Sequence, residues 1–312
     1  MSHSRAVALM VLATLLWSIA GVVTRHLDAA RSFEVTFWRS LFNAVTLVLL
    51  LVPLRGAALW RDICAGDRVI WFSGLCWAVM YTTFMVALTL TSVANVLVAM
   101  ATGPLLTALF ARVFLGHRLP ARTWIAIGVA GLGIVWMFGA EAASDPLGTS
   151  LLGSLVALGV PLASSANFTL LQHRASVVRQ GGAAQDMLPA ILLGATLSAA
   201  ATLPLAWPLQ ASTHDIGLLA LLGTVQLAVP CLLVVRLSRE LPATEIALLA
   251  MLEVIFGVLL AWIGAGEVPA DSTLAGGALV LGALVANQLQ GARQRPGRRL
   301  DTAAASETAP GK

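Results

Sequence analysis

The chain has 312 residues, of which 58% are hydrophobic and only 11% are charged, and its mean hydropathy is +0.87. Soluble domains usually carry about 25% charged residues. A water-soluble protein of this size would have too few charges to cover so much apolar surface. The composition therefore excludes an ordinary cytoplasmic enzyme, a secreted disulfide scaffold and a disordered chain, and the apolar excess must face lipid.

The basic residues are distributed singly between apolar runs. The net charge is +4, the isoelectric point is about 9.6, and Lys312 is the only lysine. A face that binds nucleic acid gathers basic residues in a polar context, whereas single arginines beside apolar runs are typical of membrane anchors. The cysteines Cys64, Cys76 and Cys231 include no CxxC pair, which argues against a disulfide framework and a metal site. We expect a lipid bilayer and no nucleic acid as partner.

Apolar runs of membrane-spanning length recur along the whole chain. A spanning helix needs about 20 apolar residues, because roughly 30 Å of hydrocarbon is crossed at about 1.5 Å per residue. Runs between charges and turn residues predict an all-α integral membrane protein with ten transmembrane helices. The predicted spans are 6–24, 33–53, 69–89, 92–115, 122–140, 151–172, 187–207, 215–236, 243–265 and 273–291.

Arginines gather on one side of this predicted arrangement. They occupy the N-terminal segment, the C-terminal segment and the loops after the second, fourth, sixth and eighth spans, whereas the opposite loops carry Arg25 and Arg31. The positive-inside rule then places both termini in the cytoplasm. An even number of spans also puts both termini on the same side, and we expect a multi-pass protein of the cell inner (plasma) membrane. Residues 292–312 are basic and lack an apolar period, and we expect them to form a disordered cytoplasmic tail.

The two halves of the chain share one pattern of apolar runs and turns. A shift of 150 residues lays Gly116-His117 over Gly266-Glu267 and Thr123 over Thr273. Each half holds five predicted spans, so the halves would cross the membrane in opposite directions. We therefore expect two inverted five-helix repeats, at 6–140 and 151–291, an architecture typical of transporters with a site near the membrane midplane.

Several short segments of both halves resemble a known repeat. In the first half they are Leu15-Leu16-Trp17-Ser18, Phe37-Trp38-Arg39, Gly103-Pro104-Leu105-Leu106-Thr107-Ala108 and Leu115-Gly116-His117-Arg118-Leu119. In the second half they are Leu241-Pro242-Ala243-Thr244, Leu252-Glu253-Val254 and Gly266-Glu267. Through them, roughly residues 6–290 resemble the EamA family of the drug/metabolite transporter superfamily. The resemblance implies ten helices and the export or exchange of small metabolites. His117 and Val254 depart from the usual Glu and Pro of the family, so the family's pair of glutamates at the two repeat ends is incomplete.

Two charged residues inside predicted spans are candidate site residues. Glu253 lies ten residues into its span, roughly 15 Å deep, where a charge usually faces a cavity or a partner. It would couple transport to protons, bind a substrate amine, or serve as a structural glutamate at a helix contact. Arg39 lies six residues into the second span, and it would reach outward to water, pair with Glu253, or bind an anionic group of the substrate.

Polar and aromatic side chains inside the spans complete the candidate cavity. An aromatic wall with few polar contacts suits a small amphipathic molecule, although each residue could also serve helix packing alone. These candidates are Trp17, Trp77, Tyr81, Asn95, Asn167 and Gln226. Pro104, Pro161 and Pro230 predict bends in the spans that would line the cavity. Small residues in the fifth and tenth spans predict close helix packing, within the chain or in a homodimer. They are Gly128, Gly131 and Gly133, and Ala278, Gly282 and Ala286.

Motifs for catalysis are missing from the sequence. A Walker loop is impossible with a single terminal lysine, and there is no HExxH sequence. We therefore expect no enzyme activity and no cofactor, and energy from an ion gradient such as that of protons, from exchange, or from the substrate itself. The sequence favours an exporter of a small metabolite, an amino acid or related zwitterion, by alternating access. An importer or exchanger of a vitamin or nucleotide-type metabolite, a multidrug efflux carrier, and a non-transporting membrane enzyme or assembly factor remain alternatives.

Overall fold

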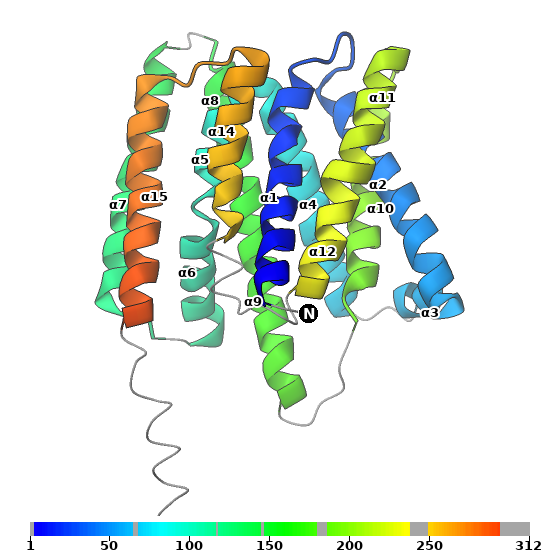
Figure 1. Ribbon diagram of the computed structural model, residues 1–312, viewed down its shortest axis with the longest axis horizontal. Helices are drawn as coiled ribbons and strands as arrows, with labels where there is room; N and C mark the ends of the chain where they lie inside the picture. Colours follow the sequence, from blue (N-terminus) through cyan, green and yellow to red (C-terminus); the bar gives the residue numbers. More distant parts are fainter. Residues whose placement is uncertain are drawn as a thin grey trace, which may run out of the picture.

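The computed structural model describes residues 3–64, 68–116, 118–144, 147–179, 186–237 and 249–293, and all regular elements of this part are helices. Figure 1 shows most of them standing side by side, with α1 beginning at the same lower side at which α15 ends. The elements are α1 (His3–Thr24), α2 (Ser32–Arg55), α3 (Ala57–Cys64), α4 (Arg68–Leu90), α5 (Val93–Met100), α6 (Gly103–Leu115), α7 (Ala121–Ser144), α8 (Thr149–Ala157), α9 (Gly159–Arg179), α10 (Leu188–Ala206), α11 (Thr213–Leu221), the π-helix η1 (Leu222–Ala228), α12 (Val229–Leu237), α14 (Leu252–Ala265) and α15 (Asp271–Arg293).

Eight helical stretches of the described residues are long and apolar enough to cross a membrane, which confirms an all-helical membrane protein. They match the first eight predicted spans. The last two predicted spans correspond to shorter apolar helices, at Leu252–Ala265 and Asp271–Asn287. The predicted span 243–265 begins outside the described residues, so the count of ten spans stays a prediction. Most of the predicted tail 292–312 also lies outside the described residues.

Three of the spans are interrupted, each next to one of the three prolines that predicted a bend. The fourth span divides into α5 and α6, because Pro104 has no N–H to donate to Met100. The sixth divides into α8 and α9 at Leu158, three residues before Pro161. In the eighth, the π-helix η1 ends two residues before Pro230 and separates α11 from α12. The predicted bends are confirmed.

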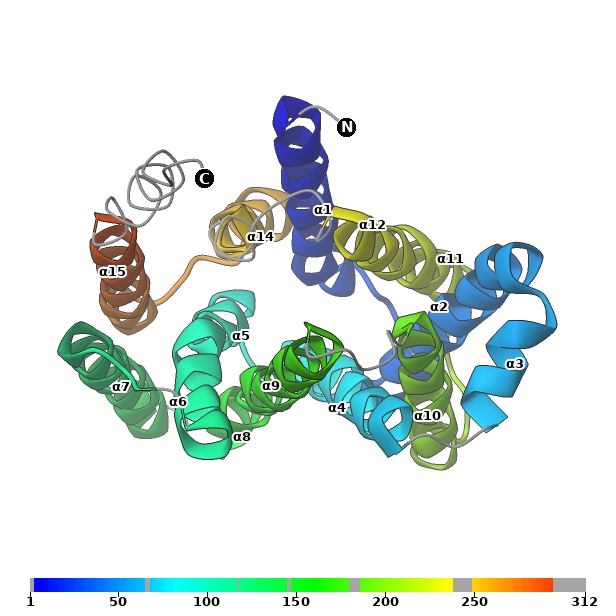
Figure 2. The ribbon, with the colours of Figure 1, turned by 90° about the horizontal axis from the view of Figure 1, so that it is seen from below.

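The helices pack in two groups that share α1, α4 and α9 at the centre. Figure 2 shows α7 and α15 side by side at one end and α2, α3 and α10 at the other. Between them, α1 packs against α14 and α12, and α4 packs against α9 and α10. One apolar core joins α4, α5, α7 and α15, and a second joins α2, α4, α10 and α12. The site described below lies at the second core.

Small residues bring α7 and α15 together, as the sequence predicts for the fifth and tenth spans. A Cβ atom at Gly133 would lie 2.7 Å from the carbonyl oxygen of Gly276, so these two backbones approach as closely as glycine permits. Three glycines of the predicted faces, Gly128, Gly131 and Gly282, have no neighbour within 4 Å. The close contact therefore rests on Gly133, and its partner Gly276 was not among the predicted residues.

Two features differ from the sequence prediction. The loop after the second span contains a helix, α3, which buries Leu59 and exposes Trp60 and Arg61. This helix has eight residues, which are too few for a membrane span. In addition, Glu141 lies inside α7, where it is buried, although the predicted span ends at residue 140. Hydrogen bonds from neighbouring helices to its carboxylate allow this burial, and such bonds are invisible in the sequence.

Candidate substrate-binding site

Arg39 is the largest fully buried side chain of the described residues, with only 2% of its surface exposed. It lies on α2, which packs along α10, η1 and α4. Among the described residues, no carboxylate forms an ion pair with its guanidinium. A cation buried in hydrocarbon without a counter-charge is expensive, so its neighbours must supply hydrogen bonds.

Gln226 supplies these bonds from the π-helix η1. Its Oε1 accepts from Nε of Arg39 at 3.1 Å and from Nη2 at 2.9 Å, and its own Nε2 donates to the carbonyl oxygen of Trp17 at 3.1 Å. The amide therefore connects α2, α1 and the eighth span. Gly223 allows the approach, since a Cβ atom there would lie 2.6 Å from the carbonyl oxygen of Arg39.

One edge of the guanidinium is left for another partner. Gln226 takes the edge formed by Nε and Nη2, and Nη1 has no hydrogen-bond partner in the described part of the chain although it is buried. Nη1 and the second hydrogen of Nη2 form the end-on edge, which matches the two oxygens of a carboxylate. Arginine in this arrangement can recognise an anionic group that enters the protein.

Two further polar side chains close to Arg39 also lack partners. Both amide atoms of Asn43 and the hydroxyl of Tyr81 are buried without a hydrogen bond among the described residues. Asn43 lies one turn from Arg39 on the same face of α2. Asn43 and Cys231 come close to the Tyr81 hydroxyl, but without the geometry of a hydrogen bond. Buried polar groups are usually satisfied, so this concentration of unsatisfied atoms points to a binding site.

Aromatic rings surround these polar groups. The rings of Trp77 and Tyr81 lie on one face of α4, with centroids 5.5 Å apart. The guanidinium of Arg39 lies over the ring of Phe84, 5.4 Å from its centroid, which favours a buried cation. Trp17 is half-buried and packs against the same core. The arrangement is an apolar enclosure with a few directed polar atoms, as small-molecule sites require.

Glu253 lies in the first turn of α14, directly after the described chain resumes. Its carbonyl oxygen accepts a hydrogen bond from the Ser18 hydroxyl at 3.2 Å, which attaches α14 to α1. Its carboxylate and Arg39 interact electrostatically, although no direct ion pair joins them. The two charges thus belong to one neighbourhood, contributed by opposite halves of the sequence.

The structure brings six of the eight predicted site residues into one neighbourhood around Arg39, counting Arg39 itself. The other five are Trp17, Trp77, Tyr81, Gln226 and Glu253. Asn167 is buried elsewhere, on α9, where its Oδ1 accepts from the Ser73 hydroxyl at 2.7 Å. Asn95 lies at the beginning of α5, bonded to Glu141 and Thr273. Asn43 was missed by the sequence analysis, although its position four residues after Arg39 would have placed it on the same helix face.

At the end of the bundle where α1 ends, an ion pair joins the two halves of the sequence. Nε of Arg25, just after α1, contacts Oε2 of Glu267 at 2.6 Å. The two terminal nitrogens of Arg25 donate to the carbonyl oxygens of Leu88 and Thr91. Glu267 also accepts from the backbone N–H of Val93 at 2.5 Å. We call these contacts the outer clasp; they join α1, the α4–α5 junction and the loop before α15.

A second carboxylate ties down the α1–α2 loop. Asp215, in the first turn of α11, is fully buried and accepts from the backbone N–H groups of Asp28, Ala29 and Ala30. With Ser212 it also forms a capping box at the beginning of α11. Both this loop and the outer clasp lie at the ends of the helices rather than at Arg39, so they fix the outer end of the site and do not form it.

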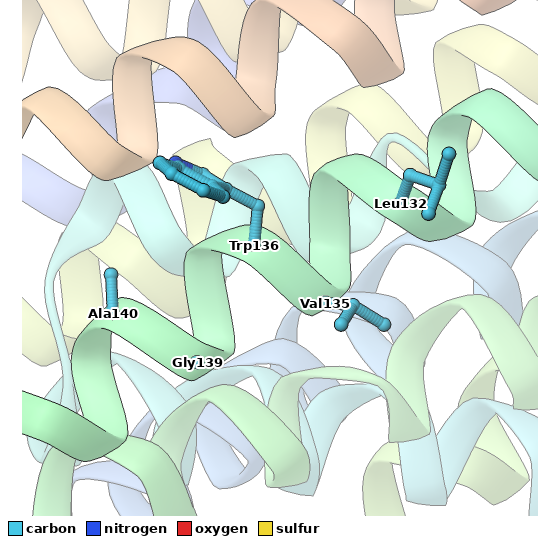
Figure 3. Close-up of a pocket in the computed structure, with 5 residues that line it drawn as sticks. All are labelled: Leu132, Val135, Trp136, Gly139 and Ala140. Carbon is cyan, nitrogen blue, oxygen red and sulfur yellow. The ribbon is translucent and has the colours of Figure 1, made fainter.

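An apolar groove is present on the outside of the bundle, on α7. Figure 3 shows its lining, formed by Leu132, Val135, Trp136, Gly139 and Ala140. Three of them, Leu132, Val135 and Trp136, are exposed large apolar side chains. The lining carries no charged group, so the groove lacks the features of the Arg39 site.

Comparisons with known proteins agree with this architecture. Residues 4–139 match the model of the EamA-like transporter family. The chain is 26% identical, over 287 residues, to the pseudopaline exporter CntI of Pseudomonas aeruginosa strain UCBPP-PA14 and, equally, of strain PAO1; the match covers 90% of this chain and 94% of the exporter. A solved crystal structure superposes with a TM-score of 0.63 at 19% identity, over 94% of this chain and all of the other, which supports the fold. The chain is thus a multi-pass membrane protein, and its residues 4–139 are similar to the EamA-like transporter family.

Proposed function

We propose that the protein is a secondary transporter of the inner membrane that exports a small metabolite carrying a carboxylate and an amine, by alternating access. The observation that carries the proposal is the unsatisfied end-on edge of the buried Arg39 guanidinium, which fits a carboxylate. Glu253 supplies an opposite charge for the amine, and Trp77 and Tyr81 supply an aromatic wall. That a relative at 26% identity is an exporter supports the direction of transport.

The proposal includes two inverted five-helix repeats, at 6–140 and 151–291, that together form ten spans. Its support is the position of matching backbone features 150 residues apart. Gly116 and Gly266 end α6 and α14 in the same left-handed conformation, with φ of 68° and 66°, which only glycine adopts freely. The breaks before α6 and α14 also correspond, since these helices begin at Gly103 and Leu252.

The orientation in the membrane follows from the arginine distribution. We propose that both termini face the cytoplasm, which agrees with α1 beginning and α15 ending on the same side (Figure 1). The outer clasp then lies on the periplasmic side and holds the exit closed. In this state the substrate would reach Arg39 from the cytoplasm, and breaking the clasp would release it outward.

Metabolite profiling tests the proposal directly. Cells that overproduce the wild-type chain should accumulate a carboxylate- and amine-bearing compound in the medium, and cells that produce Arg39→Gln at equal membrane level should not. The matched control is Arg31→Gln, which removes an exposed arginine at the N-terminal end of the same helix, α2, outside the buried cluster. If the wild-type chain moves no such compound, or if Arg39→Gln exports it equally well, the proposal is wrong.

Binding to purified protein separates recognition from transport. Each compound that appears in the medium is added to detergent-solubilised protein beside its methyl ester, which keeps the amine but loses the carboxylate charge. The free acid should raise the thermal unfolding temperature of the wild type and the ester should not, because only the acid fits the guanidinium edge. Equal stabilisation by both would contradict the assigned role of Arg39.

A further inference from the structure

Another buried carboxylate, that of Glu141, lies outside the Arg39 site. Glu141 is 8% exposed on α7, and its Oε1 accepts from the Thr91 hydroxyl at 2.8 Å, from Nδ2 of Asn95 at 2.7 Å and from the Ser150 hydroxyl. The Oδ1 of Asn95 in turn accepts from Thr273 at 2.6 Å. These groups come from α5, α7, α8, α15 and the junction before α5, and we call them the Glu141 cluster.

The other oxygen of this carboxylate has no partner within the described part of the chain. Oε2 of Glu141 is buried and forms no hydrogen bond with any described residue. The described part of the chain also provides no cation for it: Arg112 lies at the far end of α6, and Arg122 lies at the other end of α7. A carboxylate with one saturated and one unsatisfied oxygen, surrounded by neutral donors, is an incomplete arrangement unless it binds a cation.

A proton fits this arrangement better than a sodium ion. A sodium ion needs several oxygen lone pairs directed at one point. In the Glu141 cluster, the hydroxyls of Thr91 and Ser150 and the amide of Asn95 direct hydrogens, not lone pairs, toward the carboxylate. A proton needs only the one free oxygen, Oε2.

The Glu141 cluster is joined to the outer clasp through one residue. Thr91 donates its hydroxyl to Glu141, and its carbonyl oxygen accepts from Nη2 of Arg25 at 2.7 Å. The charged groups nearest in the packed elements are the Arg25–Glu267 pair of the clasp and Asp271, which is exposed at the beginning of α15. Asp145, four residues after Glu141, lies outside the described residues. The helices α5 and α8 carry no ionisable side chain.

We infer that Glu141 is the proton-binding residue that couples the outer clasp to the proton gradient. The inference rests on the proposed function, which it deepens by naming the coupling ion and its site. In the ionised state, Glu141 holds the α4–α5 junction through charge-assisted hydrogen bonds from Thr91 and Asn95. A proton taken up from the outer side on Oε2 neutralises the carboxylate and weakens these bonds. Thr91 then anchors Arg25 less firmly, and the clasp opens.

Infrared difference spectroscopy of the purified protein tests this without a substrate. Acidification of the wild type should produce a carboxyl C=O band that is lost in Glu141→Gln and retained in Asp28→Asn, the matched control with an exposed outer carboxylate. Replacement of choline chloride by sodium chloride should leave the spectrum unchanged. Glu141→Asp keeps a titratable group, so its band should shift rather than vanish, which separates loss of the site from misfolding.

The outcomes distinguish this inference from the proposed function. If the folded Glu141→Gln variant still produces the carboxyl C=O band on acidification, the proton site is wrong even when export is confirmed. The same holds if sodium chloride changes the spectrum of the wild type but not that of this variant. For the compound identified by profiling, Glu141→Gln in proteoliposomes should retain substrate counterflow and lose movement driven by a pH gradient. Loss of both activities in a folded protein would contradict a coupling role, whereas a wild type without any transport would contradict the proposed function instead.

Discussion

Replacing Gln226 by leucine should unfold the protein far more easily than the loss of one polar side chain suggests. The amide accepts both hydrogen bonds that satisfy the buried guanidinium of Arg39, at 3.1 and 2.9 Å. Leucine is similar in size but accepts nothing, so Gln226→Leu leaves a cation with 2% exposure and no acceptor on that edge. Breaking a buried charged contact from one side costs about 3–5 kcal/mol, because the remaining charge stays desolvated.

A double-mutant cycle identifies the source of this loss. Arg39→Met removes the charge and fills similar volume, so Arg39→Met/Gln226→Leu should lie within about 2 kcal/mol of the wild type, mainly through the lost bond to Trp17. The free energy of unfolding is measured by reversible denaturation in mixed micelles for the wild type, both single variants and the double variant.

The cycle has a clear opposite outcome. If Gln226→Leu costs less than about 1 kcal/mol, or if the double variant is destabilised by the sum of the two single variants, Arg39 and Gln226 are not energetically coupled. The hydrogen bonds would then be incidental, and the argument that the remaining guanidinium edge is held in place for a ligand would fail with them.

Three further substitutions test the packing. Gly223→Ala should lower the free energy of unfolding by about 1–3 kcal/mol and abolish export, because its Cβ atom meets the backbone of α2, whereas Gly217→Ala in open space should be neutral. Gly133→Ala should separate α7 from α15 with a similar loss, and Gly128→Ala on the same helix should not. Ser212→Ala should cost about 1 kcal/mol by removing the capping box of α11. Thermal unfolding in detergent measures the stability of every variant. If a glycine variant and its control lower the unfolding temperature equally, the assigned contact is wrong.

The sequence predicts the helices of this protein better than the contacts between them. Apolar runs bounded by charges give the spans, and prolines give the interruptions, because both effects act within a few residues. Arg39, Gln226 and Tyr81 could be selected as site residues because a polar group inside an apolar run is locally conspicuous. The hydrogen bonds between Arg39 and Gln226 join residues 187 positions apart, and only the fold brings them together.

The residues that sequence reasoning misplaced depend on distant partners. Glu141 follows an apolar run and resembles a loop residue until Thr91 and Asn95 are seen to bond to it. The sequence analysis assigns Asn95 to the same cavity as Arg39 because both are polar residues of predicted spans, but its partners belong to the Glu141 cluster. Distances across a helical bundle are not encoded in hydropathy, so one predicted cavity becomes two separate polar clusters in the structure.

The pairing of α7 with α15 has a consequence for biosynthesis. These helices lie far apart in the sequence, and α15 leaves the ribosome after every other described helix. Until then, the Gly133 face of α7 has no protein neighbour from α15 and stays in contact with lipid. A nascent chain arrested before Asp271 would display this uncovered face, by which membrane quality control could distinguish an unfinished carrier from a complete one.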